Sequence, residues 1–243
     1  MTRPKRDELK YIISWEKKRA LLERIGHALE KDEYSDNRAS TPILSLYYDS
    51  PHYHFYHEKH EGVPYRNKVR VRTYDYNFAG SKLAFIEVKK KIFEKVQKIR
   101  IKKKNFTSAM LDPHSWEFDQ DKEGLLGKII ERYNIVPAVQ VFYMREAFVG
   151  AHDSDLRVTF DSLITALYPH EDLVRDDLVR PDRMLIPEQY YVLEIKATEK
   201  IPHWISDIIA EFQLIQTAFS KYTTAVEKLN LLEMMPEVGV YEL

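Results

Sequence analysis

Pairs of charged side chains recur in six segments of this 243-residue chain, five of them two positions apart and one four positions apart. The alternate positions in these segments are strongly apolar, and a period of two is typical of β-strands with one charged and one apolar face. Arginine and lysine dominate the charged positions, and their donors match the oxygens of phosphate groups. The pairs are Glu8/Lys10, Arg70/Arg72, Glu87/Lys89, Lys98/Arg100, Arg157/Asp161 and Glu194/Lys196.

Four carboxylates are interspersed with these cations, at Glu8, Glu87, Asp161 and Glu194. Carboxylate oxygens are hard ligands that suit Mg²⁺ or Mn²⁺ bridging a phosphate chain. Two positions keep alternative roles at this stage. Glu87 either holds a metal ion or neutralises Lys89 or Arg100. Arg145 either binds phosphate or forms a structural pair with Glu146 or Asp161.

The elements that would carry these side chains are runs of strands with a few helices, which indicates an α+β fold. No internal repeat and no flexible linker is visible, so we expect one domain. The predicted strands cover 7–13, 43–49, 66–74, 138–149, 156–161, 190–197 and a hairpin over 83–104 with its turn at Phe93-Glu94. The predicted helices are one capped by Ser14 and running to about Glu33, a second over 124–133, a third beginning at Pro202 and a fourth over 221–233.

The charged faces allow two interpretations. In the first, an open sheet turns one wet face to water and its charges pair across strands. In the second, the strands close into an antiparallel barrel, with apolar residues outward under helices and charged residues inward. We favour the closed barrel because at least six strands share the pattern and contain few neutral polar side chains. Like charges in a lumen are costly to desolvate, so such a lumen needs an anionic ligand.

Composition narrows the class of protein further. The formal net charge is −1, so attraction for anions must come from segregated charge, and there is no cysteine for disulfides or thiolate metal sites. No apolar signal core and no window of about 18 apolar residues is visible, so we expect a reduced cytoplasmic protein without a membrane span. The four histidines of 52–60 fit no established metal motif, and we expect a solvent-facing polar segment there.

Taken together in chain order, these segments resemble a known family. They look like the VTC domain, the polyphosphate polymerase branch of the triphosphate tunnel metalloenzyme (CYTH-like) superfamily. Glu8 and Lys10 are similar to the Glu-x-Lys signature of the whole superfamily, and the FSKY piece at Phe219 to Tyr222 looks particular to the polymerase branch. The matching pieces are RDELKYII, SLYYDS, KVRVRTY, FIEVKKK, KIRIKKK, LRVTFD, VLEIK and AFSKY.

This resemblance implies one domain over 1–243, an eight-stranded tunnel that binds ATP, and transfer of the γ-phosphoryl group to a growing polyphosphate chain with Mn²⁺ or Mg²⁺. Positioning and charge neutralisation would do most of the work, without a protein nucleophile. The implied catalytic residues are Lys10, Arg70, Arg72, Lys89, Arg100 and Lys196. The implied substrate-binding residues are Lys98, Arg145, Arg157, Ser220 and Lys221. The implied metal ligands are Glu194, with Glu8 and Glu87 in support.

Two features depart from the family pattern. Some members carry a basic residue where this chain has Ala218, and the acidic segment 168–188 has no assigned role. A triphosphatase acting in the same tunnel is therefore the alternative function, and a non-catalytic polyphosphate-binding module is the second alternative. Nucleic acid is disfavoured as a partner because carboxylates are interleaved with the basic residues.

Overall fold

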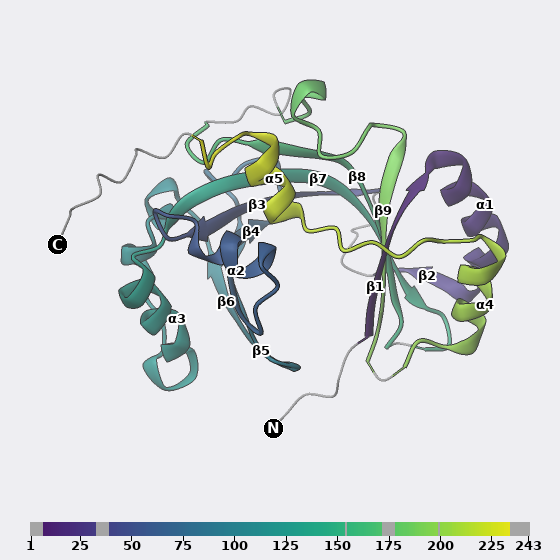
Figure 1. Cartoon of the computed structure of the whole chain (residues 1–243), viewed down its shortest axis with the longest axis horizontal. Helices are drawn as coiled ribbons and strands as arrows, with labels where there is room; N and C mark the ends of the chain where they lie inside the picture. The colour runs from purple at the N-terminus through teal and green to yellow at the C-terminus, as the bar shows by residue number, and fades with distance from the viewer. Residues whose placement is uncertain (1–6, 33–38, 154, 172–177, 199, 234–243) are drawn as a thin grey trace. The chain divides into compact units, whose positions relative to one another are not determined.

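The computed structural model describes residues 7–32, 39–153, 155–171, 178–198 and 200–233 (Figure 1). Residue contacts divide the chain into two compact units. The first unit consists of Met1–Ile43, Phe142–Thr165 and Val179–Ser220, and the second unit of Leu44–Val141, Ala166–Leu178 and Lys221–Leu243. The single domain over 1–243 stays a prediction, and the two units are described one at a time below.

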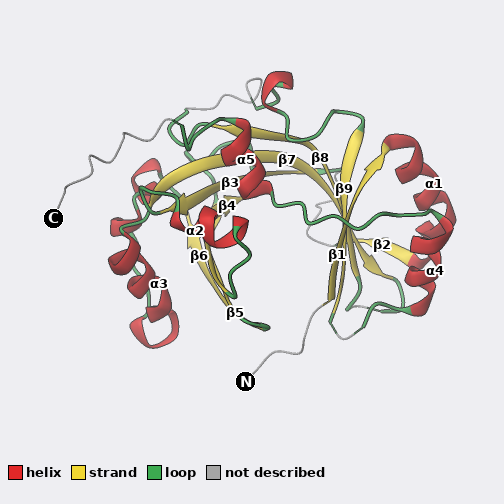
Figure 2. Ribbon diagram, in the orientation of Figure 1, coloured by secondary structure: helices red, strands yellow, loops and turns green. Residues whose placement is uncertain are grey.

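Strands dominate the described residues, and they pair in the order β1-β9-β8-β7-β3-β4-β5-β6, with the short β2 on β7 (Figure 2). The pairs β1–β9, β2–β7, β3–β4, β4–β5, β5–β6 and β8–β9 are antiparallel, as predicted. The strands are β1 (Asp7–Ser14), β2 (Leu29–Lys31), β3 (Thr41–Asp49), β4 (Tyr65–Thr73), β5 (Leu83–Ile92), β6 (Lys95–Lys104), β7 (Val136–Gly150), β8 (Arg157–Leu167) and β9 (Tyr190–Ala197).

The strand order has two ends, β1 and β6, and among the described residues no pairing joins them. An antiparallel sheet with helices is therefore confirmed, whereas closure of the sheet into a barrel is not. The structure has nine strands where the sequence predicted eight. The additional strand, β2, lies where the first helix was expected to continue.

The first helix begins where the sequence predicts and ends early. The Ser14 hydroxyl caps it by accepting a hydrogen bond from the Lys17 backbone N–H at 3.3 Å. The helix ends at Ile25, with a 3₁₀ turn, η1 (Gly26–Ala28), between it and β2, so its predicted extension to about Glu33 is wrong. Leu29 is buried in β2 instead of in a helix. One buried residue at the end of a periodic run fits both structures, so the pattern could not separate them.

The remaining helices are short and follow the predicted order, with one addition. No helix among the described residues is long and apolar enough to cross a membrane. The helices are α1 (Trp15–Ile25), α2 (His54–His60), α3 (Gln120–Tyr133), α4 (His203–Glu211) and α5 (Lys221–Lys228). The further 3₁₀ segments are η3 (Ser108–Leu111), η4 (Pro113–Ser115) and η6 (Pro181–Arg183). Of the predicted irregular segment 168–188, residues 172–177 lie outside the described residues.

In the first unit, α1 and α4 lie beside each other over the apolar face of β1, β8 and β9 (Figure 1). Burial of this face removes apolar surface from water and leaves the alternate, charged positions on the opposite face. The predicted division of each strand into an apolar and a charged face is confirmed here. The core residues are Tyr11, Ile13, Leu21, Ile25, Leu29, Leu156, Val158, Phe160, Leu193, Ile195, Ile205 and Ile208.

In the second unit, β3, β4, β5 and β6 form a continuous antiparallel ladder. The predicted hairpin is confirmed, with Phe93 at its turn in the left-handed region (φ 52°), as two-residue hairpin turns require. The apolar positions Val69, Val71, Ile86 and Val88 are buried. Their neighbours in sequence therefore share the other face of the ladder.

Asp49 organises the region where the sequence predicted a solvent-facing polar segment. Its buried carboxylate accepts backbone hydrogen bonds from Ser50 (2.7 Å), Phe55 (2.8 Å) and Tyr56 (2.9 Å), so it caps α2. It also accepts a hydrogen bond from the Tyr222 hydroxyl on α5. The His54 N–H donates to the Ser50 hydroxyl at 3.0 Å. Asp49 and Ser50 together therefore satisfy the first N–H groups of this helix.

We predict that Asp49→Ala lowers the free energy of unfolding by about 2–4 kcal/mol, because three backbone donors and one hydroxyl lose their buried acceptor. Urea titration measures this loss. The control is Asp119→Ala, since Asp119 caps α3 with an exposed carboxylate, and such a cap contributes only about 1 kcal/mol. Equal losses in the two variants would contradict this role of Asp49.

Candidate functional site

The first unit gathers four predicted site residues on neighbouring strands. Register places Glu8 opposite Lys196 and Lys10 opposite Glu194 on β1 and β9. The Lys10 ammonium lies 3.0 Å from Glu8 Oε1 and 3.6 Å from Glu194 Oε1, and the Lys196 ammonium lies 3.0 Å from Glu194 Oε2. Each lysine is therefore held by a carboxylate from its own strand or the adjacent strand.

Arg145 on β7 joins this cluster through two carboxylates. Its Nε and Nη2 donate to Asp161 Oδ1 and Oδ2 at 2.6 and 2.7 Å, and its Nη2 lies 3.8 Å from Glu194 Oε2. A bidentate pair of this kind fixes the plane of the guanidinium. The structural pair with Asp161 that the sequence left open is thus present, and it holds Arg145 beside Glu194.

The charges of this cluster depend on one another. Burial raises the pKa of Glu194, but Lys196, a hydrogen bond with Glu8, Lys10 and Arg145 outweigh burial and leave that pKa well below its usual range. Burial likewise opposes the charge on Lys10, and Glu194 and Glu8 raise its pKa in spite of it. Glu194 is therefore ionised and Lys10 protonated at neutral pH.

Two residues on β8 complete the charged face of the first unit. Arg157 lies opposite Lys196 in register, and its Nη2 lies 2.7 Å from Asp32 Oδ2. Thr159 lies opposite Glu194, and its hydroxyl oxygen is buried without a hydrogen-bond partner among the described residues. Arg157 was predicted to bind phosphate, and the structure places it in an ion pair at the edge of this face.

The first-unit carboxylates can be compared with the needs of a divalent metal ion. No group of three or more His, Asp or Glu side chains among the described residues is arranged to hold a metal ion. Glu8 and Glu194, which share Lys10, are two hard oxygen ligands. Mg²⁺ is commonly bound by one or two carboxylates plus substrate phosphates. This pair therefore fits a metal ion that arrives with a phosphate chain.

The second unit arranges its cations in rows across the ladder. One row runs from Tyr47 through Arg70 and Glu87 to Arg100, from β3 to β6. The row on one side is Lys68, Lys89 and Lys98, and the row on the other side is Ser45, Arg72, Phe85 and Lys102. The predicted residues Arg70, Arg72, Lys89, Lys98 and Arg100 are thus neighbours on one face. Lys89 and Lys98 are exposed there.

Glu87 lies at the centre of these rows. Arg70 Nε donates to Glu87 Oε2 at 2.6 Å, Arg100 Nε lies 3.3 Å from Oε1, and Arg72 Nε lies 4.0 Å from Oε2. Burial raises the pKa of Glu87, but the three arginines outweigh it and lower that pKa to about 2. This geometry favours the neutralising role that the sequence left open. A metal-binding role for Glu87 stays a prediction without support from these contacts.

Further contacts fix the arginines in place. Arg72 Nε donates to the Ser45 hydroxyl at 3.2 Å, and Arg100 stacks on Phe85 with its Cζ 3.7 Å from the ring centroid. Arg100 Nη2 also donates to the Tyr74 hydroxyl at 3.2 Å. Guanidinium groups held by rings and hydroxyls need little reordering when an anion binds.

Three members of this face, Lys68, Lys102 and Tyr47, are not among the site residues predicted from the sequence. Lys68 and Lys102 share the alternation of the predicted residues, so the pattern itself could have included them. Tyr47 contacts Arg70 and Lys68, but an aromatic residue in a strand is ordinary, and only the register reveals its position. Hydroxyl and ring contacts of this kind carry no signal in a single sequence.

The FSKY piece spans the boundary between the two units. In the first unit, the Lys10 ammonium donates to the Phe219 backbone carbonyl at 3.4 Å. Ser220 ends that unit, and Lys221 begins α5 in the second unit. In the second unit, Tyr222 packs against Tyr47 with ring centroids 5.3 Å apart. Phe219 thus contacts the predicted site residue Lys10, and Tyr222 contacts Tyr47, each within its own unit. Ligand roles for Ser220 and Lys221 stay predictions.

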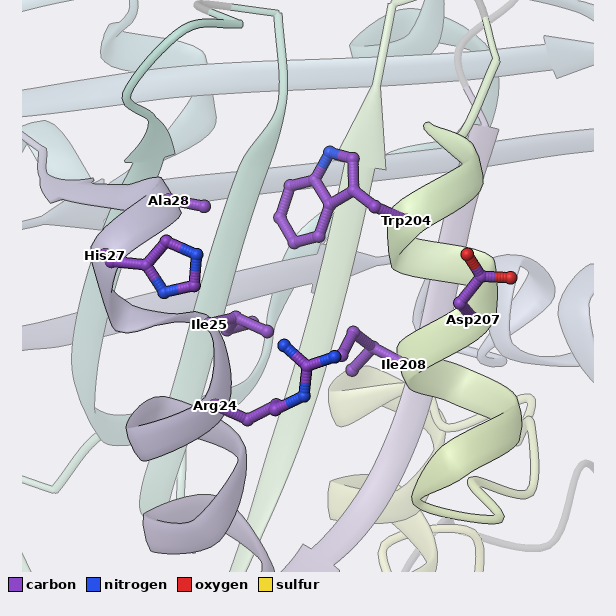
Figure 3. Close-up of a pocket in the computed structure, with 7 residues that line it drawn as sticks. All are labelled: Arg24, Ile25, His27, Ala28, Trp204, Asp207 and Ile208. Atoms are coloured by element: carbon purple, nitrogen blue, oxygen red, sulfur yellow. The ribbon is translucent and has the colours of Figure 1, made fainter.

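A pocket of about 260 Å³ lies elsewhere in the first unit, between α1, η1 and α4 (Figure 3). None of the predicted site residues lines it. Arg24 at its edge is already paired with Glu211 at 3.3 Å. The pocket is therefore separate from the charged faces described above. Its lining residues are Arg24, Ile25, His27, Ala28, Trp204, Asp207 and Ile208.

Comparison with known proteins gives one strong match. The model of the VTC domain matches residues 5–230. No curated protein matches the chain. Among solved structures, a protein of Pyrococcus horikoshii OT3 is 14% identical over 92% of this chain and 99% of that chain, with a TM-score of 0.46.

Two further solved structures have similar or lower TM-scores. A protein of Vibrio parahaemolyticus, described as a candidate adenylate cyclase, is 12% identical over 93% of this chain and 98% of that chain, with a TM-score of 0.46. The Mimivirus capping enzyme triphosphatase is 11% identical over 86% of this chain and 90% of that chain, with a TM-score of 0.38.

We predict that Glu87 makes stability fall in acid. A carboxyl whose pKa is about 2 when folded, against an ordinary value near 4.5, stabilises the fold above pH about 4.5 and loses that contribution as pH falls towards 2. Urea titrations should show wild type losing about 2 kcal/mol more than Glu87→Gln between pH 7 and pH 3. The control is Glu23→Gln, on an exposed helix pair. Equal losses in wild type and Glu87→Gln would refute the prediction.

Proposed function

The chain belongs to the VTC domain family, and from this premise we propose that it is a metal-dependent polyphosphate polymerase. In the proposed reaction the γ-phosphoryl group of ATP passes to the end of a growing polyphosphate chain, and ADP is released. The observation that carries the proposal is the second-unit face, where seven Lys and Arg side chains surround the single carboxylate of Glu87. Those cations are Lys68, Arg70, Arg72, Lys89, Lys98, Arg100 and Lys102.

A face with this excess of positive charge favours a ligand with several negative charges. Neighbouring rows lie two residues apart along each strand, which is roughly 7 Å. A linear phosphate chain presents charge continuously along its length, so it can meet cations from more than one row. A compact single phosphate can meet only one. We therefore assign Arg70, Arg72, Lys89, Lys98 and Arg100 to the binding of a phosphate chain.

The first-unit face has a different balance, because Lys10, Arg145, Arg157 and Lys196 lie among Glu8, Asp161 and Glu194. In this proposal Glu194, with Glu8, would hold the divalent metal ion. That ion would neutralise charge on the reacting phosphates and orient them. Lys10 and Lys196 would bind phosphate oxygens beside it, and Arg145 would stay oriented by Asp161.

Transfer of a phosphoryl group requires little covalent chemistry from the protein. The transition state spreads charge over the equatorial oxygens, so positioned cations and charge neutralisation supply most of the acceleration. The cationic side chains of both faces do this, and no protein nucleophile is required. The closed eight-stranded barrel predicted from the sequence is part of this proposal, because closure would exclude water that could compete with the acceptor phosphate.

One feature favours a second candidate function. Ala218, which is exposed and neutral, stands where some family members carry a basic residue. A protein that binds its polyphosphate product less tightly would transfer the phosphoryl group to water, and would not extend the polymer. A triphosphatase acting on inorganic or nucleoside triphosphates is therefore the alternative, and a polyphosphate-binding module without activity is the second alternative.

One assay separates these functions. The purified chain is incubated with ATP and Mn²⁺ or Mg²⁺, and the products are resolved on a urea gel with parallel assays for ADP and free phosphate. Polyphosphate with ADP supports the polymerase, and free phosphate without polymer supports the triphosphatase. If neither product forms while polyphosphate still binds, both enzymatic proposals fail.

We predict that Arg70→Ala and Glu194→Gln each lower kcat by at least about 100-fold, because Arg70 would bind the phosphate chain and Glu194 would hold the metal ion. Circular dichroism should show that both variants remain folded. Arg19→Ala is the matched control, since Arg19 is an exposed cation on α1 that pairs only loosely with Glu23. Wild-type rates in Arg70→Ala and Glu194→Gln would refute the assignment of the site.

A further inference from the structure

Tyr47 occupies an unusual position for a phenol. Its side chain is 2% exposed, and its hydroxyl accepts a hydrogen bond from Arg70 Nη1 at 3.4 Å. The Lys68 ammonium lies 5.1 Å from the ring centroid, and the Arg70 Cζ lies 5.9 Å from it. The ring is therefore buried among cations that belong to the phosphate-binding face.

The groups around Tyr47 come from four elements. From β4 come Lys68, Arg70 and Arg72, and from α5 comes the Tyr222 ring, whose hydroxyl donates to Asp49. Glu87 on β5 is the nearest carboxylate in the row, and its contacts are made to the arginines. Arg100 on β6 binds the far side of Glu87. Positive charge therefore dominates around the phenol.

These neighbouring cations favour loss of the Tyr47 phenol proton when no anion is bound. Burial raises the pKa of Tyr47, but Lys68, Arg70 and Arg72 outweigh burial and lower that pKa to about 7. A phosphate chain on the same rows reverses the balance. It neutralises the cations that favour the phenolate, and its own charge repels a phenolate oxygen.

We propose that the Tyr47 hydroxyl is a further ligand of the phosphate chain, and that this oxygen takes a proton from solvent when the chain binds. The only bond formed in this step is the O–H bond of the phenol. That O–H then donates a hydrogen bond to a phosphate oxygen, while Arg70 stays within reach of both. The inference rests on the proposed function only in taking an oligophosphate as the anion, and it does not require catalysis.

Affinity for an oligophosphate should then depend on pH through Tyr47. A site that binds its anion only with the phenol protonated loses affinity above the pKa of Tyr47. From pH 6 to pH 8.5 the expected loss is about 30-fold. Tyr47→Phe has no proton to lose, so the pH dependence that remains in it comes from the phosphate itself and from other groups.

The test is calorimetry with inorganic triphosphate, without metal, at pH 7.5 in buffers of different ionisation enthalpy. Wild type should take up roughly 0.8 of a proton more per bound triphosphate than Tyr47→Phe does. The matched control is Tyr65→Phe, an exposed tyrosine of β4, which should behave as wild type. Equal proton uptake in wild type and Tyr47→Phe would overturn the inference, as would a failure of wild type to bind triphosphate.

Absorbance at 295 nm, which reports phenolate, keeps the inference testable if Tyr47→Phe does not fold. Wild type and Tyr65→Phe should each show one tyrosine that titrates near pH 7, and saturating triphosphate should move that midpoint upward. A titration without such a midpoint, or one that triphosphate leaves unmoved, would overturn the inference. Proton uptake without polymer formation would refute the polymerase alone, and polymer formation without proton uptake would refute the role of Tyr47 alone.

Discussion

The Glu87 carboxylate accepts a hydrogen bond from Arg70 Nε at 2.6 Å, and its oxygens lie within 4.0 Å of the Nε atoms of two further arginines. These ion pairs permit three guanidinium groups to stand on one face of the β3–β6 ladder, because unpaired like charges at that spacing repel. One carboxylate cannot neutralise the whole face, however, and the lysine row beside it has no acid in register. On this face of the second unit, lysine and arginine side chains therefore outnumber carboxylates.

In the first unit, repulsion between cations on one face of the sheet is reduced in a different way. Its cations are interleaved with Glu8, Asp161 and Glu194, so nearly every charge has a partner on its own or a neighbouring strand. Such a face offers carboxylate oxygens as well as cations. The two faces therefore differ in composition: carboxylates balance the cations of the first unit, whereas cations predominate on the face of the second unit.

Period-two alternation predicted the charged faces correctly because the pleat of a strand is a local property, visible in residues such as Lys98 and Arg100. Register is not local, so the sequence could not show that Tyr47, Arg70 and Glu87 form one row. Side-chain contacts and distant pairing explain the other differences. Asp49 caps α2 and binds the distant Tyr222, and pairing with Gly150 converts the expected end of the first helix into β2. The role of Glu87 likewise became clear only from its three arginines.

We propose that an anionic phosphate chain bound to the basic rows stabilises the folded state of this protein. The most direct measurement is the midpoint of thermal unfolding with increasing inorganic triphosphate, compared with sulfate at equal ionic strength. Binding to the folded state alone stabilises it by about 2.7 kcal/mol at a ligand concentration 100 times Kd. We expect the midpoint to rise by several degrees with triphosphate, to rise far less with sulfate, and to rise less in Arg70→Ala. Identical effects of triphosphate and sulfate would contradict the account.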